Sequence, residues 1–246
     1  MAKKIVKRKN HPITGKGVER AIYFDFEGLG PSKNNPDPPP LLAGVLCEGD
    51  YQVFVLDTQL SDLTNEQEIR YQSLEKFCST VLSKARQEDR RLICWSWYDL
   101  EVFRNQNFPP ENIGFDVKIP FDKERKKDST LKKVYQDYKK NKDKYRQKGL
   151  AAATKKALRP KAHSLLTLVA AALGKPRPPS FGAGLVGKWL RSMIAQSQRQ
   201  VPYQSWWPSA IKNVRKLLNH NRHDCCATKY VLKKLLDMGI RHGKSQ

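Results

Sequence analysis

The chain has 246 residues, enough for one large domain or for one domain that carries an insertion. Its charge is strongly unbalanced, since 46 Lys and Arg residues stand against 24 Asp and Glu residues and give a formal net charge of +22. Such an excess predicts a polyanionic partner, and nucleic acid is the most common one. We find no long apolar run, signal peptide or lipidation motif, so we expect a protein that is not bound to membranes.

The five cysteines do not form a recognisable framework. Cys225 and Cys226 are adjacent, but no CxxC pair occurs, and the spacing matches neither a zinc site nor a set of disulfides. Free thiols in a reducing compartment are the simplest interpretation, and we therefore expect a cytoplasmic protein.

The first half of the chain predicts alternating strands and helices. Residues 1–20 are basic and lack periodicity, and we expect a flexible arm there. The pattern after the arm predicts strands over 21–27, 41–47 and 51–56, a helix over 65–86, a strand over 91–95, a helix from about 99 and a strand over 115–119. The sequence Glu48-Gly49-Asp50 suits a hairpin turn, so an antiparallel pair should lie beside parallel strands. This order predicts an α/β fold with a mixed sheet flanked by helices.

Composition changes sharply after this first part of the core, 21–118. Residues 118–161 contain 17 Lys or Arg against 5 acidic residues, and we interpret 119–161 as a basic helical insertion. The globular pattern returns over 162–246, with helices predicted over 163–173, 184–197 and 211–238. Within the insertion, lysines that could follow phosphates alternate with tyrosines that could stack on bases: Lys132, Lys133, Tyr135, Tyr138, Lys139, Lys140 and Tyr145. A solvated helix with excess charge is the alternative.

Two carboxylates on the first strand are the first candidate for chemistry. Residues two apart in a strand point to the same face, so Asp25 and Glu27 should project together while Phe24 and Phe26 face the core. Paired carboxylates repel each other and lose hydration when buried, and a divalent cation with oxygen ligands removes both costs. The alternative is a solvated pair at the rim of the sheet.

Two further acidic positions could join this pair. His220 and Asp224 are four residues apart and should share one face of the last helix. Asp99 lies where a strand gives way to a helix, and Glu101 is the other acidic candidate in that segment. Each has an ordinary alternative, because His220 and Asp224 could be an exposed helix pair and Asp99 could be a helix cap.

The order of these motifs resembles the DEDD exonucleases, the DnaQ-like branch of the ribonuclease H-like fold. The nearest pattern is a predicted bacterial exonuclease group with a YNxxDxxAT third motif. Four residues match this motif and His220 replaces its tyrosine; the matching residues are Asn221, Asp224, Ala227 and Thr228. Residues 163–174 also resemble the SL…LG segment that precedes it. The resemblance covers about 1–118 and 162–240 and leaves out the basic insertion.

The resemblance implies a ribonuclease H-like sheet and a 3′-5′ exonuclease that hydrolyses single-stranded DNA or RNA. It implies that two Mg²⁺ or Mn²⁺ ions are held by four carboxylates, those of Asp25, Glu27, Asp99 and Asp224. His220 would position or deprotonate the attacking water, and an imidazole titrates closer to pH 7 than a phenol does. We expect little sequence specificity. A degenerate nuclease that only binds nucleic acid, an endonuclease or resolvase on the same scaffold, and a basic protein without chemistry remain alternatives.

Overall fold

The structure is a computed structural model that describes residues 10–65, 69–147, 149–151, 153–154, 164–176 and 184–239. Its centre is a mixed sheet with the strand order β4-β3-β2-β1-β5-β6. The strands are β1 (Ile22–Glu27), β2 (Leu42–Cys47), β3 (Asp50–Val55), β4 (Ile69–Tyr71), β5 (Leu92–Cys94) and β6 (Gly114–Asp116). β1, β2 and β3 pair antiparallel, whereas β5 runs parallel to β1, β6 to β5 and β4 to β3. The expected α/β fold with a mixed sheet is confirmed.

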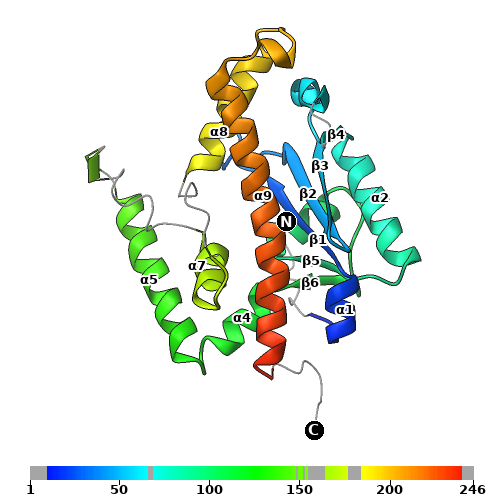
Figure 1. Ribbon diagram of the computed structural model, residues 1–246, viewed down its shortest axis with the longest axis vertical. Helices are drawn as coiled ribbons and strands as arrows, with labels where there is room; N and C mark the ends of the chain where they lie inside the picture. The colour runs from blue at the N-terminus through cyan, green and yellow to red at the C-terminus, as the bar shows by residue number, and fades with distance from the viewer. Residues whose placement is uncertain are drawn as a thin grey trace.

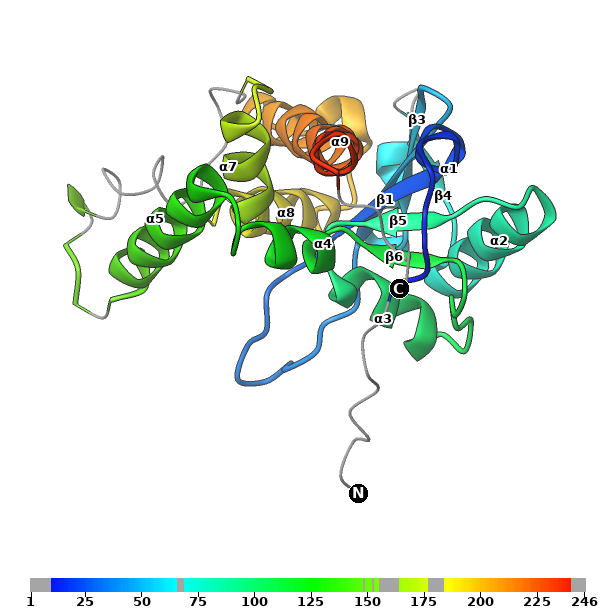
Figure 2. The same cartoon turned by 90° about the horizontal axis from the view of Figure 1, so that it is seen from below.

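Helices cover both faces of the sheet (Figures 1 and 2). On one face, α2 (Leu74–Gln87) and α3 (Trp97–Asn105) pack against the side chains of Ile22, Phe24 and Phe26. On the other face, α7 (Leu165–Ala172) and the long α9 (Pro208–Asp237) pack against Tyr23. Further along α9, α8 (Leu185–Ser197) and the 3-10 helix η1 (Thr58–Asn65) enclose the apolar side chains of β2 and β3, and the short η3 (Tyr203–Ser205) precedes α9. No described helix has the length and apolar character needed to cross a membrane.

The segment predicted as one helix over 65–86 is three elements. η1 ends at Asn65, β4 adds an edge strand, and α2 begins only after Ser73, whose side chain accepts a hydrogen bond from the Lys76 amide. The prediction was wrong because Ile69 fits the helical spacing of the apolar residues that follow it. In the structure, Ile69 is buried opposite Val53 of β3.

The second half of the predicted flexible arm is folded and not flexible. Residues 15–20 form α1 (Gly15–Arg20), which is capped by Thr14 and buries Val18, and Ile13 before it joins the same core. Lys229 and Lys233 of α9 form ion pairs with Glu19 of this helix. The interpretation as an arm is therefore wrong for residues 10–20, and residues 1–9 lie outside the described part of the chain.

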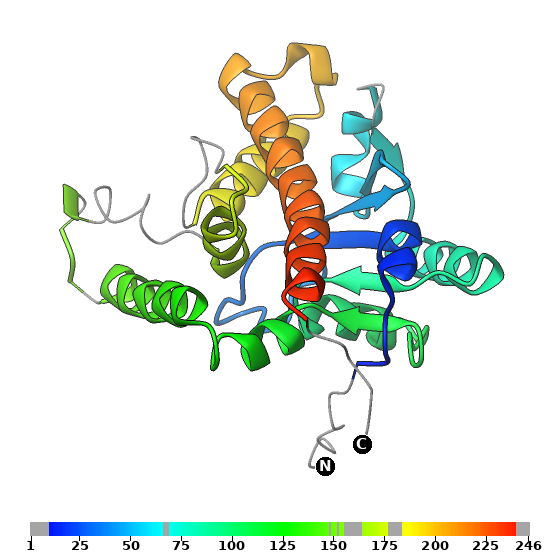
Figure 3. The ribbon, with the colours of Figure 1, turned by 60° about the horizontal axis from the view of Figure 1, so that its bottom comes forward.

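The basic insertion begins as part of the core. It contains α4 (Lys118–Glu124) and α5 (Ser129–Arg146), and the side chains of Phe121 and Leu131 are fully buried in the cluster under α9. Beyond its first turn, α5 leads away from the sheet, with α7 between it and α9 (Figure 3). The expectation that 119–161 stays outside the core is thus wrong for its first part. Residues 148, 152 and 155–161 lie outside the described residues.

Candidate functional site

Four carboxylates come together from three elements. β1 and β5 are parallel, so the residues at the carboxyl end of β1 and those just after β5 meet at one edge of the sheet. Asp25 and Glu27 end β1, and Asp99 lies in the first turn of α3, directly after β5. Asp224 reaches this edge from α9, which crosses the sheet face (Figure 1). The exposed fractions are 7% for Glu27, 5% for Asp99 and 8% for Asp224.

Asn221 ties α9 to the first of these carboxylates. Its amide nitrogen donates to Oδ2 of Asp25 at 2.9 Å and to the Asp25 carbonyl oxygen at 3.0 Å. The Tyr51 hydroxyl donates in turn to Asn221 Oδ1 at 2.8 Å. This chain of hydrogen bonds from β3 through α9 to β1 fixes the orientation of the Asp25 carboxylate.

Gly44 makes this close approach possible. It lies opposite Asp25 in the β1–β2 register, and a Cβ atom at Gly44 would lie 1.6 Å from Asn221 Oδ1. Any side chain there would displace the Asn221 amide from Asp25. The absence of a side chain at Gly44 of β2 is therefore a requirement of the site.

His220 lies between two of the carboxylates. Its Nε2 is 3.7 Å from Glu27 Oε1 and 3.7 Å from Asp224 Oδ2, and its ring meets the Trp189 ring edge-on at a centroid distance of 6.1 Å. Burial lowers the pKa of His220 to about 4, so the imidazole is neutral at neutral pH. The imidazole is therefore less basic than a free one, and the sequence could not show this because it does not show how deeply the ring is buried.

The electrostatics of the cluster follow from burying like charges together. Burial raises the pKa of Asp99 to about 7 and the pKa of Asp224 to about 7. Burial and then the neighbouring carboxylates raise the pKa values of Asp25 and Glu27 well above their usual range. Among the described residues, nothing donates a hydrogen bond to Glu27 Oε1 or Asp224 Oδ1, although both atoms are buried. A buried oxygen without a donor is costly, and a cation would remove that cost.

The cluster fits a hard divalent cation by its chemistry but not by its present side-chain positions. The donor set consists of carboxylate oxygens, which Mg²⁺ and Mn²⁺ prefer. However, no group of three or more described His, Cys, Asp or Glu side chains is placed so that it could hold a metal ion. Ligation would require the carboxylates to rotate toward one another, which like charges resist until a cation lies between them.

The two acidic candidates after β5 differ in their surroundings. Asp99 is buried, accepts a hydrogen bond from Ser96 Oγ at 3.2 Å, and is one of the charges that raise the pKa of Asp25. The Glu101 side chain is 43% exposed and accepts hydrogen bonds from Arg104, at 2.7 Å, and from the Trp97 indole. The structure therefore places Asp99, and not Glu101, in the carboxylate cluster.

The candidate nucleic-acid residues lie on α5, outside this cluster. Lys132, Lys133, Lys139 and Lys140 are exposed. Tyr135 and Tyr138 are half-buried and pack against the core cluster under α9, and the Tyr135 ring lies 3.8 Å from the Arg125 guanidinium. Tyr145 is half-buried near Gly184. The aromatic rings thus do not stand free among the lysines, as base stacking would require.

Three residues of the site were not predicted from the sequence. Gly44 and Tyr51 lie on β2 and β3, far in sequence from the third motif that they support, and only the alternation of β3 could have pointed to Tyr51. Trp189 on α8 contacts His220 but carried no sequence signal. All three act through contacts between distant elements.

The chain was compared with protein-family models, with curated proteins and with solved structures, and none of them matches it. The functional argument therefore depends on the geometry of the chain itself.

Proposed function

We propose that the protein is a metal-dependent phosphodiesterase that acts on nucleic acid, with its active site at the carboxylate cluster. The observation that carries this proposal is a cluster of four acidic side chains from β1, α3 and α9 at one edge of the sheet, of which Glu27, Asp99 and Asp224 are buried and Asp25 is half-buried. A protein seldom buries several carboxylates together without a cation or a reaction that uses them. The antiparallel hairpin beside parallel strands also suits a ribonuclease H-like sheet, with β4 as an additional edge strand.

Each residue of the cluster has a role in this proposal. The carboxylates of Asp25, Glu27, Asp99 and Asp224 would bind two divalent cations, which supply Lewis acidity and lower the pKa of bound water. Asn221 holds Oδ2 of Asp25 and so orients this carboxylate for binding. His220, which is neutral, accepts the proton of the attacking water at Nε2. Water would add to phosphorus as the P–O bond to the leaving oxygen breaks, and the proton held by His220 would pass to that oxygen, so that the products are a phosphomonoester and an alcohol.

The substrate class follows from charge. The exposed lysines of α5 offer a cationic surface to a phosphate backbone, and the inward tyrosines leave it without a base-reading element. We therefore expect DNA or RNA to be bound with little sequence preference, and the preference for single strands rests on the resemblance to DEDD exonucleases. Cleavage from the 3′ end rests on the resemblance to DEDD exonucleases alone.

A nucleic-acid-binding protein without chemistry is the second candidate. Two observations favour it: the described side chains do not yet form a metal-holding group, and His220 is a weaker base than the sequence indicated. In that case the cluster would be a remnant of an active site, and the α5 lysines would carry the function.

Cleavage assays separate these candidates. The full chain would be incubated with linear and circular single strands of DNA and RNA, with Mg²⁺, Mn²⁺ or EDTA. We expect cleavage of linear strands that needs metal and is abolished by Glu27→Gln, while the control Glu101→Gln cleaves normally. Cleavage of circles would show an endonuclease. No metal-dependent cleavage of any of these strands would contradict the proposal and favour the binding protein.

A further inference from the structure

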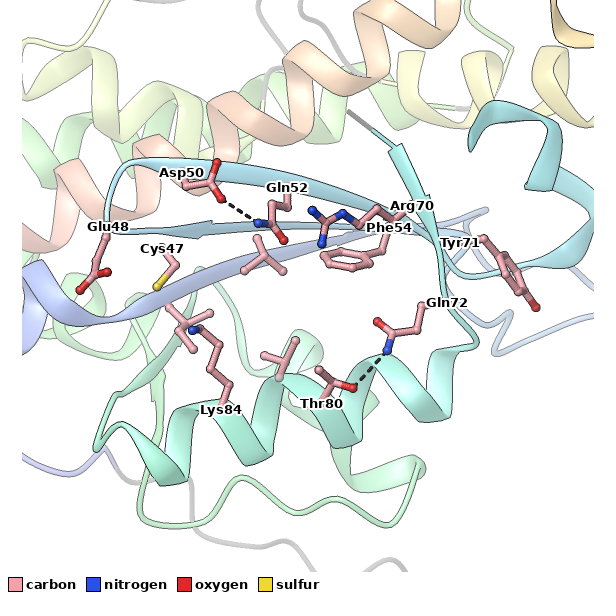
Figure 4. Close-up of a pocket in the computed structure, with 13 residues that line it drawn as sticks. Cys47, Glu48, Asp50, Gln52, Phe54, Arg70, Tyr71, Gln72, Thr80 and Lys84 are labelled. Atoms are coloured by element: carbon pink, nitrogen blue, oxygen red, sulfur yellow. Dashed lines mark hydrogen bonds between the residues drawn. The ribbon is translucent and has the colours of Figure 1, made fainter. Parts of the chain in front are cut away.

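A groove of about 740 Å³ lies on the opposite face of the sheet from the carboxylates (Figure 4). It lies between α2 and the strands β2, β3 and β4, which all contribute lining residues. Val45, Phe54 and Val81 form apolar parts of its lining, and polar side chains from β3, β4 and α2 surround them. Its volume is typical of pockets for small molecules, which measure roughly 300–1,000 Å³.

Glu48 and Lys84 at the groove have oppositely charged partners, whereas Asp50 keeps its charge because its partner is a neutral amide. Glu48 pairs with Arg90 at 2.7 Å, Lys84 pairs with Glu88 at 2.6 Å, and Asp50 accepts a hydrogen bond from the Gln52 amide at 2.7 Å. Arg70 of β4 also lines the groove, and it has no ion pair or hydrogen bond among the described residues. One unpaired guanidinium indicates a place for one anionic group, and a phosphate is the anion that its fork geometry fits well.

Two glutamine amides offer acceptors to the same space. The nitrogen of Gln52 is held by Asp50, and the nitrogen of Gln72 donates to Thr80 Oγ1 at 3.1 Å. Because both nitrogens are held in this way, both amide oxygens face the groove (Figure 4). A ligand with N–H donors, such as an exocyclic amino group of a base, would satisfy them.

The aromatic ring of Phe54 lies beside the Arg70 guanidinium, which reaches toward Gln52 (Figure 4). Phe54 pairs with Arg70 in the β3–β4 register and stands two residues after Gln52, on the same face of β3. Its inner side packs against Phe77 at a centroid distance of 5.2 Å, which fixes the ring. Neighbouring positions on one sheet face are roughly 5–8 Å apart, so the amides, the ring and the guanidinium can contact one small molecule.

We propose that this groove binds a nucleoside monophosphate whose base carries an exocyclic amino group. The base would lie on Phe54 with its amino group toward Gln52 and Gln72, and the phosphate would bind Arg70. The site is separate from the carboxylate cluster and does not require that the cluster be catalytic.

Calorimetric titration of the full chain in EDTA tests the proposal, because EDTA prevents a nucleotide from binding through metal at the carboxylates. AMP and CMP should bind more tightly than UMP, whose base lacks an amino group. Arg70→Gln should weaken AMP binding by about 10- to 100-fold, the effect of removing a charged hydrogen bond. Binding of adenosine, which lacks the phosphate, should not change. Gln72→Leu should weaken both ligands, and Lys76→Gln, on an exposed part of α2, is the matched control.

Three results would overturn the proposal. The first is no saturable heat with AMP up to roughly 10 mM, a concentration that would detect even weak binding. The second is equal affinity of AMP for the wild-type chain and for Arg70→Gln. The third is ribose 5-phosphate binding as tightly as AMP, which would show that the base is not recognised. Arg70 is exposed, so these variants should fold, and thermal unfolding of each variant checks this.

Discussion

The carboxylate cluster and the lysine face of α5 differ in how far their like charges are exposed to water. In the cluster, three buried acids and the half-buried Asp25 lie beside one another, and their pKa values rise as a result. On α5, the lysines are exposed, where water and salt screen them. Exposed like charges cost little and need no explanation beyond solubility, whereas buried like charges need something that offsets their desolvation. The acid cluster is therefore the stronger indication of chemistry. The lysines indicate nucleic-acid binding only in combination with this cluster.

The largest effect should come from pH. Asp99 and Asp224, with pKa values raised to about 7, bind protons in the folded state that they release in the unfolded state between about pH 4 and 7. Without metal, the free energy of unfolding should therefore fall as pH rises through this window, by several kcal/mol in order of magnitude. His220, with its lowered pKa, opposes this change only in part.

Denaturant unfolding in EDTA at about pH 5 and about pH 8 measures this effect. Adding Mn²⁺ should restore stability mainly at the higher pH, where the carboxylates are ionised. The double variant Asp99→Asn, Asp224→Asn should lose the part of the pH dependence that these two carboxylates cause, while Asp25 and Glu27, whose pKa values are also raised, keep the rest. Equal stability of the metal-free wild-type chain at both pH values would show that the cluster is not strained by its charge.

Removal of the candidate base should have the next largest effect. His220→Ala should lower the cleavage rate by about 100-fold, the lower end of general-base contributions, because a pKa of about 4 makes a weak base. The exposed neighbour Asn219→Ala is the control and should cleave at the wild-type rate. A normal rate for His220→Ala would mean that the water loses its proton without this ring.

Gly44→Ala tests the support of the site. The added methyl should displace Asn221 and break its hydrogen bond to Asp25, at a cost of about 1–3 kcal/mol in stability, and weaken metal binding. A Cβ atom at Gly30 would meet nothing within 4 Å, so Gly30→Ala is the matched control. If both variants unfold at the same denaturant concentration, the close approach of α9 over Gly44 is not required.

The smallest effect should come from α5. Neutralising Lys132 and Lys139 should weaken nucleic-acid binding a few-fold and reduce the slope of log K against log salt by about one for each phosphate that is no longer neutralised. Tyr135→Phe should leave affinity unchanged, since the ring lies under Arg125. An unchanged salt slope for the lysine variant would place the binding surface elsewhere on the protein.

The sequence predicted the parts of the site that depend on local periodicity. Alternation along β1 correctly separated Phe24 from Asp25, and the four-residue spacing of His220 and Asp224 placed both on one face of α9. The strand-to-helix junction placed Asp99 but could not distinguish it from Glu101, because that choice depends on Arg104 and on burial.

The parts that depend on long-range contacts were not predictable. Gly44 matters only because α9 crosses β2, and Tyr51 only because its hydroxyl reaches Asn221 from another element. Phe121 and Leu131 were assigned to a solvated insertion because lysines surround them in sequence, yet both are buried under α9. Composition averaged over a segment hides single apolar residues that join a distant core.

Titration of the full chain with Mn²⁺ at about pH 8, followed by calorimetry, tests the central claim most directly, because it asks whether the carboxylates hold metal at all. The account predicts about two ions per chain. It also predicts that Asp25→Asn and Asp224→Asn no longer bind the metal, and that Glu101→Gln binds it as the wild-type chain does. No binding at millimolar Mn²⁺, or equal binding by the wild-type chain and by Asp25→Asn and Asp224→Asn, would contradict it.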